Sequence, residues 1–171
     1  MSRRISRRDF QQALTQRLTS AARGEVARTL LGAISGDELW LFDLAETGEV
    51  LPVPALVDVP LTRPWFAGLA NVRGTLYSVV DFAAFRGTEP TPRGSEARLL
   101  LIGMPAGGNS ALLVARTLGL KSMDKLKEEE DEARDAPTWL GRRYCDDKGK
   151  HWRSLRARQL LTHPDFLNIG Q

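Results

Sequence analysis

The side chains best suited to chemistry in this sequence are one cysteine and two histidines, Cys145, His151 and His163. Five residues separate Cys145 from His151, and no second pair of ligands accompanies them as a structural zinc site requires. A thiol beside an imidazole can also be an activated nucleophile. We expect Cys145 to be inert beside a hairpin turn and both histidines to lie at the surface or in loops. The spacing therefore predicts no metal site and no catalytic residue.

Two other segments have the composition of a ligand site but lack its essential residues. Residues 128–132 are all acidic, yet they lack the glycine that interrupts an EF-hand loop. Residues 103–108 are rich in glycine but contain neither the lysine nor the Ser/Thr of a phosphate loop, and no long helix follows. A serine nucleophile elbow is also missing. We therefore expect no cofactor and no enzymatic activity.

Charge is arranged in blocks along the chain. The net charge of the 171 residues is only +3. Residues 37–60 carry six acidic and no basic side chains, whereas residues 136–171 carry seven basic and three acidic ones. A nucleic-acid-binding protein usually gathers its positive charge into one stripe. The alternation of sign therefore argues against nucleic acid as the partner.

The sequence favours a cytoplasmic protein without direct membrane insertion. No apolar run approaches the roughly 20 residues that a membrane-spanning helix needs. The basic N-terminus is not followed by the apolar segment of a signal peptide. A single cysteine cannot form an intramolecular disulfide, which fits a reducing compartment.

Helices are predicted only near the two ends of the chain. In residues 6–22, Phe10, Leu14 and Leu18 fall on one stripe of a helix. Residues 1–26 are therefore interpreted as an N-terminal helical extension that either docks on the core or binds a partner.

A second helix is expected over residues 155–162. Ser154 can cap its first turn, and the His163-Pro164 pair should end it, because the residue before a proline disfavours helical backbone. Residues 166–171 then form a C-terminal tail.

Between the helices the pattern is that of about ten short strands with frequent turns. Residues 29–34 and 38–42 are expected to form a hairpin around Gly36, and residues 98–103 and 110–115 to form another strand pair. The prolines of residues 51–60 place that stretch at a sheet edge, since proline cannot donate to a central ladder. The highly charged residues 121–136 are expected to form an exposed helix or a loop.

The most informative hairpin spans residues 67–82. Two strands flank Arg73-Gly74, and Gly74 can supply the positive φ that a tight turn needs. Asp81 stands where the second strand ends, and its carboxylate can cap a short helix over residues 82–85.

This hairpin resembles the CheW-like family of chemotaxis coupling domains. Residues 68–82 (GLANVRGTLYSVVDF) match the family pattern of Gly, apolar residues, Asn-apolar-Arg-Gly, a strand and a final Asp. Glu49 and the strand at residues 40–44 match at compatible spacing. The Tyr77-Ser78 pair and the N-terminal extension are more similar to the PilI-type adaptors of type IV pilus twitching systems than to flagellar relatives.

The resemblance implies a mainly β fold of two small SH3-like five-stranded barrels packed on a shared core. On this interpretation the CheW-like domain spans residues 27–165. Its first barrel covers about 37–97, and its second covers about 27–36 plus 98–155. It also implies a non-catalytic signal-transduction adaptor, recruited to membrane receptor arrays through two partners. These are the regulatory domain of a CheA-type histidine kinase and the cytoplasmic tip of a methyl-accepting chemotaxis receptor.

The resemblance also marks residues for function. Arg73 is expected to pair with Glu49 at a partner-binding surface, because a guanidinium is a rigid fork suited to a carboxylate. Three further positions, Leu44, Thr47 and Leu76, correspond to the neighbourhood of the family's receptor-binding groove, although Leu44 also fits a core position. Structural roles are expected for Gly68, Gly74 and Asp81.

Two alternatives compete with the adaptor. Small basic barrels often bind nucleic acid through exposed aromatic side chains, here Trp40, Phe42 and Tyr77. A thiol enzyme using Cys145 is the other. The sequence also departs from the family pattern at Ser78, Arg116 and Arg156, which suggests a more basic second barrel.

Overall fold

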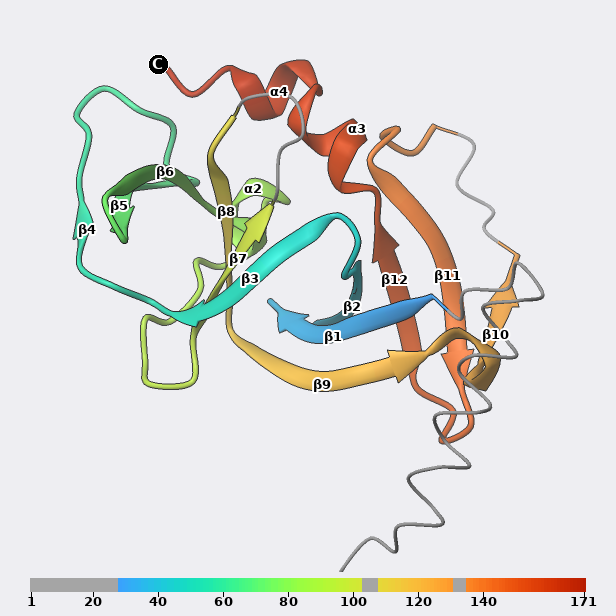
Figure 1. Cartoon of the computed structure of the whole chain (residues 1–171). Helices are drawn as coiled ribbons and strands as arrows, with labels where there is room; N and C mark the ends of the chain where they lie inside the picture. The colour runs from blue at the N-terminus through green and yellow to red at the C-terminus, as the bar shows by residue number, and fades with distance from the viewer. Residues whose placement is uncertain (1–27, 103–107, 131–134) are drawn as a thin grey trace, which may run out of the picture.

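The computed structural model describes residues 28–102, 108–130 and 135–171. In these residues the strands form two six-stranded sheets (Figure 1). The predicted mainly β class with two barrel-like halves is confirmed, but each sheet has six strands where five were expected. The helical extension predicted over residues 1–26 lies outside the described residues.

The first sheet unites the beginning and the end of the described chain, in the order β10-β11-β12-β2-β1-β9. The predicted hairpin around Gly36 is present, and Gly36 adopts a φ of +59° in its turn. Strand β12 pairs with β2 in parallel orientation and so joins the C-terminal hairpin to the N-terminal one. The strands are β1 (Thr29–Ser35), β2 (Glu38–Asp43), β9 (Arg116–Ser122), β10 (Leu126–Glu129), β11 (Leu140–Asp146) and β12 (His151–Leu155).

The second sheet is built from the middle of the chain, in the order β3-β7-β8-β6-β5-β4. Strand β3, which ends in Pro52, and strand β4, which follows Pro54, lie at the two edges, where a missing amide donor breaks no ladder. The strands are β3 (Thr47–Pro52), β4 (Leu56–Val57), β5 (Phe66–Val72), β6 (Thr75–Asp81), β7 (Arg98–Ile102) and β8 (Ser110–Val114).

The division of strands between the sheets differs from the predicted barrel boundaries. Strand β2 was assigned to the first predicted barrel, but it pairs with β1. Strands β7 and β8 were assigned to the second, but they pair with β3 and β6. The physical reason is burial: β7 and β8 are almost wholly apolar, and a central sheet position buries both faces of such strands.

The shared core lies between the two sheets. Successive side chains of β7 alternate between clusters: Leu100 and Ile102 join Trp40 and Phe82 in the main cluster, whereas Leu99 and Leu101 fill a second one. One face of the second sheet therefore packs on the shared core, and the other encloses its own apolar interior.

Two short helices near the C-terminus of the chain pack over the core (Figure 1). They are α3 (Ala157–Leu161) and α4 (Pro164–Leu167), and Leu160 and Phe166 are buried. Within the C-terminal tail expected over residues 166–171, Phe166 packs into the main core cluster. His163 does end α3, but its Nδ1 accepts a hydrogen bond from the Asp165 amide and so begins α4.

Two other local predictions are corrected. Residues 121–129, expected to be a charged helix or loop, form the end of β9, a 3₁₀ turn η1 (Met123–Lys125) and strand β10. The first turn of α3 is not capped by Ser154, because Glu46 accepts a hydrogen bond from the Ala157 amide at 3.0 Å. In both cases a distant segment supplies the partner.

None of the helices in the described residues has the length and apolar character that crossing a bilayer demands.

Candidate functional site

The turn between β5 and β6 holds Arg73 in an unusual backbone conformation. Arg73 has a φ of +52° and Gly74 a φ of +86°, the pair of positive values typical of mirror-image turns in tight hairpins. The Asn71 side chain accepts a hydrogen bond from the Gly74 amide at 2.8 Å. Asparagine, aspartate or glycine usually fills the position of Arg73, because a longer side chain is strained there. Strain of this kind is concentrated at functional sites.

Arg73 forms a bidentate ion pair with Glu49 of β3. Its two terminal nitrogens donate to the two carboxylate oxygens at 2.7 and 2.6 Å. The side chains are 76% and 40% exposed, so solvent and partners reach both groups. These hydrogen bonds hold the pKa of the Glu49 carboxyl below its usual range and raise the pKa of Arg73. Both groups therefore remain charged at neutral pH.

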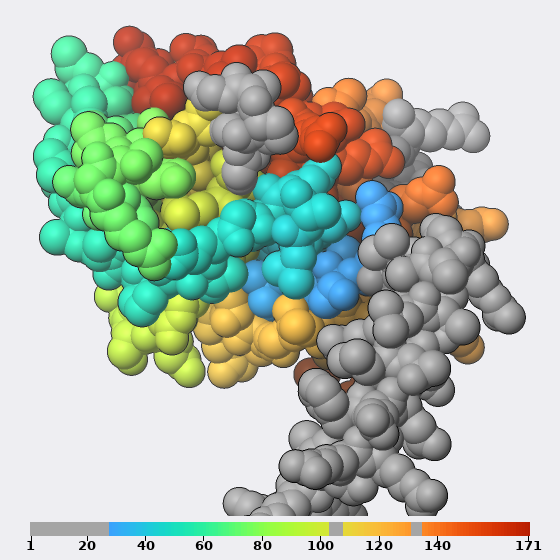
Figure 2. Space-filling model, in the orientation of Figure 1, coloured from blue at the N-terminus to red at the C-terminus, as the bar shows by residue number. Residues whose placement is uncertain are grey.

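This pair connects strands that are not neighbours in the sheet. Strands β7 and β8 separate β3 from β6, yet Arg73 at the tip of the β5–β6 hairpin reaches Glu49. The sheet must therefore curl toward closure, as expected for a barrel-like half. In Figure 2 the green β5–β6 hairpin lies beside the teal segment of β3. The exposed fractions of the two side chains place the ion pair on the surface.

The other predicted contact residues are not equally available. Leu76 follows the turn on β6 and is 58% exposed. Leu44 is partly buried against the main core cluster. Thr47 is only 3% exposed and pairs with Ile102, which argues against direct contact with a partner. The exposed part of the predicted surface thus consists of Arg73, Glu49 and Leu76.

Gly68 sits at a close approach between two strands. Its φ is +121°, and a Cβ there would lie 2.5 Å from the carbonyl oxygen of Val57 on β4. The register of β5 against β6 also shifts beside this residue. Only glycine allows edge strand β4 to pack this closely against β5.

Asp81 organises the chain beyond the hairpin. It caps α2 (Phe82–Phe85) by accepting from the amides of Ala83 and Ala84 at 3.1 and 3.2 Å. It also accepts from the amide and the hydroxyl of Thr91 at 2.7 and 2.8 Å. One buried carboxylate therefore fixes both the helix and the loop after it. The Thr91 contacts could not be read from the spacing.

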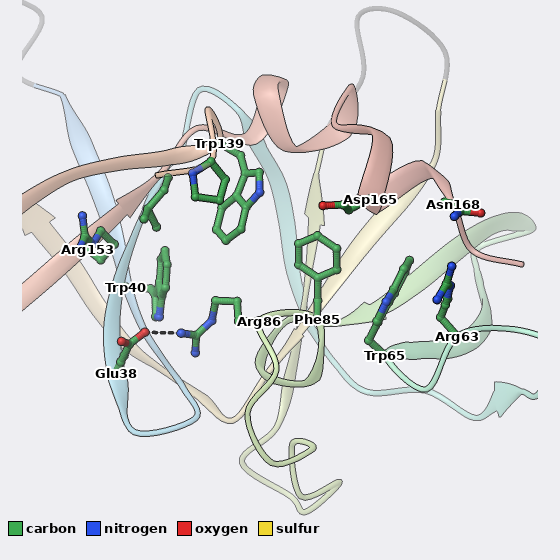
Figure 3. A pocket seen from close by; sticks show the side chains of 12 residues that line it. Glu38, Trp40, Arg63, Trp65, Phe85, Arg86, Trp139, Arg153, Asp165 and Asn168 are labelled. Atoms are coloured by element: carbon green, nitrogen blue, oxygen red, sulfur yellow. Dashed lines mark hydrogen bonds and ion pairs between the residues drawn. The ribbon is translucent and has the colours of Figure 1, made fainter. Parts of the chain in front are cut away.

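A cavity of about 560 Å³ opens beside the shared core (Figure 3). Its wall includes Arg86, whose guanidinium carbon lies 4.7 Å from the centroid of the Trp40 ring. The guanidinium also forms an ion pair with Glu38 and donates a hydrogen bond to the Ser35 carbonyl at 2.8 Å. Burial lowers the pKa of Arg86, although Glu38 opposes this effect. Arg86 was not among the residues expected to be functional. Its place directly after the apolar helix Phe82–Phe85 is the only local signal.

The aromatic side chains invoked for nucleic-acid binding lie mostly in the core. Trp40 and Phe42 are each 1% exposed, so neither can stack on a base. Tyr77 packs partly buried against the second cluster. These three side chains therefore do not form the exposed aromatic platform that this alternative requires.

Together these features define the class of the protein: a two-sheet β domain of the SH3-like barrel type, with an exposed ion pair at a strained hairpin turn. The family model described as a CheW-like domain matches residues 29–164. The chain belongs to the CheW-like family.

Individual relatives agree with this assignment. Over 72 residues the chain is 35% identical to Protein PilI from Pseudomonas aeruginosa, a match that spans 42% of this chain and only 40% of that protein. The crystal structure of the scaffolding protein TtCheW from Thermoanaerobacter tengcongensis aligns with a TM-score of 0.65 at 15% identity. That alignment covers 77% of this chain and 90% of the other, and it shows the shared fold.

Proposed function

We propose that this protein is a non-catalytic adaptor of chemotaxis-type signalling. It couples the cytoplasmic tip of a methyl-accepting receptor to the regulatory domain of a CheA-type histidine kinase, and it acts in the cytoplasm at receptor arrays. Membership of the CheW-like family supports the adaptor role. The similarity to PilI supports a pathway that controls twitching motility.

The observation that carries the proposal is the strained, ion-paired Arg73. A free surface arginine has no need of a positive φ, and an exposed ion pair contributes little to folding. A requirement for a particular surface shape explains why an arginine occupies a turn position that favours glycine or asparagine. The pair holds the guanidinium in one orientation, with exposed Leu76 on the strand that follows. A partner then meets a preorganised polar fork beside an apolar contact.

The kinase contact is expected to have a basic character. Arg116 and Arg156 are both exposed and stand where the family often has acidic residues. A kinase that matches this surface would carry acidic groups at the contact, because complementary charge sets specificity and association rate.

Calorimetric titration of the protein with the purified kinase regulatory domain and, separately, with a receptor-tip fragment tests the proposal. We expect binding in the micromolar range to each partner. Arg73→Ala should weaken binding to at least one partner by about tenfold or more, the loss expected when a central arginine contact is removed. Glu49→Gln should weaken the same interaction to a smaller extent, because it removes the orienting carboxylate but keeps the arginine.

Arg142→Ala is the matched control. Arg142 forms an ion pair with Glu128 on the first sheet, and its side chain is exposed as that of Arg73 is. It should leave the affinity for the partner that Arg73 contacts unchanged within about twofold, because Arg142 lies on the other sheet and its exposed ion pair contributes little. Equal losses for Arg73→Ala and Arg142→Ala would indicate a general charge effect. Absence of binding to both partners by the folded wild-type protein would refute the coupling role.

A further inference from the structure

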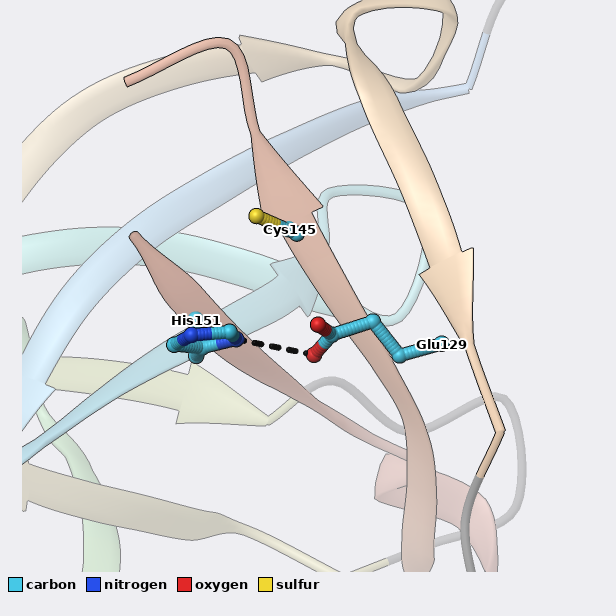
Figure 4. A group of neighbouring side chains, drawn as sticks. All are labelled: Glu129, Cys145 and His151. Atoms are coloured by element: carbon cyan, nitrogen blue, oxygen red, sulfur yellow. Dashed lines mark hydrogen bonds and ion pairs between the residues drawn. The ribbon is translucent and has the colours of Figure 1, made fainter. Parts of the chain in front are cut away.

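We propose that Glu129, Cys145 and His151 form a binding site for a thiophilic divalent metal ion such as Zn²⁺. The ligand atoms of these three side chains all lie within 4.8 Å of one another (Figure 4). The spacing of Cys145 and His151 predicted no such site. The sheet supplies what the spacing lacks, because the third ligand comes from a different strand.

The strand register explains the convergence. Cys145 on β11 lies directly opposite His151 on β12, and Lys127 on β10 lies opposite Cys145. Glu129 is two residues beyond Lys127, so it projects from the same face of the sheet. The opposite face carries Tyr144 and Trp152, which are buried in a core cluster. The three ligands therefore lie on the outer, accessible face of three adjacent strands.

The distances fit an ion after small side-chain movements. His151 Nδ1 and Glu129 Oε2 are 2.9 Å apart. On a tetrahedral zinc ion with bonds of about 2.0–2.2 Å, a nitrogen and an oxygen ligand would lie roughly 3.3 Å apart. A sulfur and a nitrogen ligand would lie roughly 3.6 Å apart. The thiol therefore has to approach the other two groups by no more than about an ångström. Cys145 and Glu129 are half-buried and His151 is exposed, so side-chain rotation can bring the three groups together.

The donor set selects the metal. One thiolate, one imidazole and one carboxylate suit Zn²⁺ and Co²⁺, whereas Ca²⁺ and Mg²⁺ prefer oxygen ligands throughout. Three protein ligands leave a fourth tetrahedral position for water or for a donor from another molecule. On binding, the thiol of Cys145 releases its proton to solvent and the sulfur lone pair forms the metal bond.

Neighbouring cations limit the affinity. Arg143 Nε lies 4.0 Å from Glu129 Oε2 and competes for the carboxylate, and Lys127 faces the same group of ligands. We therefore expect weaker binding than at a closed four-ligand zinc site. Strand β10 is at the edge of the first sheet, so a bound ion would fasten this edge to β11 and β12.

Titration of the full chain, without an affinity tag, with Co²⁺ tests the site by absorption spectroscopy. We expect one ion per chain, with a thiolate-to-cobalt charge-transfer band in the near ultraviolet and the intense visible bands of a tetrahedral ion. Added Zn²⁺ should displace the cobalt. Cys145→Ser should abolish the charge-transfer band. His151→Ala and Glu129→Gln should each weaken binding by at least about tenfold, since even outer-shell partners of a metal contribute roughly 10- to 100-fold.

His163→Ala and Glu128→Gln are the controls, because they remove the other histidine and an acidic neighbour on the opposite side of β10. Both should keep the spectrum and the affinity of the wild type. A wild-type spectrum without a charge-transfer band would overturn the proposal. So would affinity that is unchanged in Cys145→Ser, because the cobalt would then be held elsewhere.

Discussion

Replacing Asp81 tests how strongly one buried carboxylate holds the hairpin, the helix and the following loop together. In Asp81→Ala four hydrogen bonds are lost, two to the helix amides and two to Thr91. Loss of the cap should cost about 0.5–2 kcal/mol, and the unsatisfied Thr91 donors about 1–3 kcal/mol. Because these costs overlap, we expect the free energy of unfolding to fall by about 2–4 kcal/mol.

Urea unfolding followed by circular dichroism measures this loss. In a protein of this size each kcal/mol corresponds to about 2–4 °C in Tm, so the melting temperature should fall by roughly 4–16 °C. Asp58→Ala is the control, since Asp58 is exposed in the same half of the molecule, and it should change stability by less than about 0.5 kcal/mol.

Two further variants separate the contacts. Oδ1 of Asp81 accepts hydrogen bonds from three donors, and Oδ2 accepts one from the backbone amide of Thr91. In Asp81→Asn the side-chain NH₂ group replaces one of these oxygens, so in either orientation it faces a group that also donates. We expect this nearly isosteric change to cost more than about 1 kcal/mol. A double-mutant cycle with Thr91→Val should give a coupling energy of at least about 0.5 kcal/mol. Additive effects in the cycle, or a cost below about 0.5 kcal/mol for Asp81→Ala, would refute this reasoning.

Three other predictions follow from the geometry. Arg73 lowers the pKa of Glu49 below the usual 4.5, so their ion pair is complete above pH 4.5 and is lost as the pH falls through the lowered pKa. A carbon NMR titration of the Glu49 carboxyl group should show this lowered midpoint, and Arg73→Ala should raise it. Gly68→Ala should destabilise the fold by well over about 1 kcal/mol in urea unfolding, because the added Cβ would collide with the backbone of Val57. Gly87→Ala should cost less, because Gly87 also has a positive φ, +81°, but has open space around it. Equal costs would contradict the steric argument. Arg86→Ala should cost more than Glu38→Gln by the same assay, because it removes a side chain that is buried against two aromatic rings. Glutamine at position 38 is exposed and still offers Arg86 an acceptor oxygen. The reverse order would count against this assignment.

The parts of the fold that sequence reasoning predicted correctly have local causes. Turn residues at Gly36 identified the β1–β2 hairpin, and prolines identified the edge strands. The geometry of the Arg73–Glu49 pair came from the family pattern, and the two side chains do lie within hydrogen-bonding distance. Its role in binding a partner stays a prediction.

The parts that were missed depend on contacts between distant segments. Neither propensity nor spacing indicates that Glu46 caps α3, or that Phe166 returns to the core. The charged segment that contains β10 was expected to be an exposed helix or a loop, because its composition does not reveal the pairing with β11 that satisfies its backbone. Strands β2, β7 and β8 lie in other sheets than predicted for the same reason, because burial on both faces decides which sheet a strand joins.

The strand order has a consequence for synthesis on the ribosome. Every strand of the second sheet lies within residues 47–114, so this half can assemble while the rest of the chain is still being made. The first sheet needs β12 beside β2, and β12 ends at Leu155, close to the C-terminus. Until then the hairpin that carries Trp40 and Phe42 lacks the strand that pairs with it. The nascent protein therefore exposes the unpaired backbone edge of β2 until β12 has been made, which makes this interval the stage at which chaperones matter most.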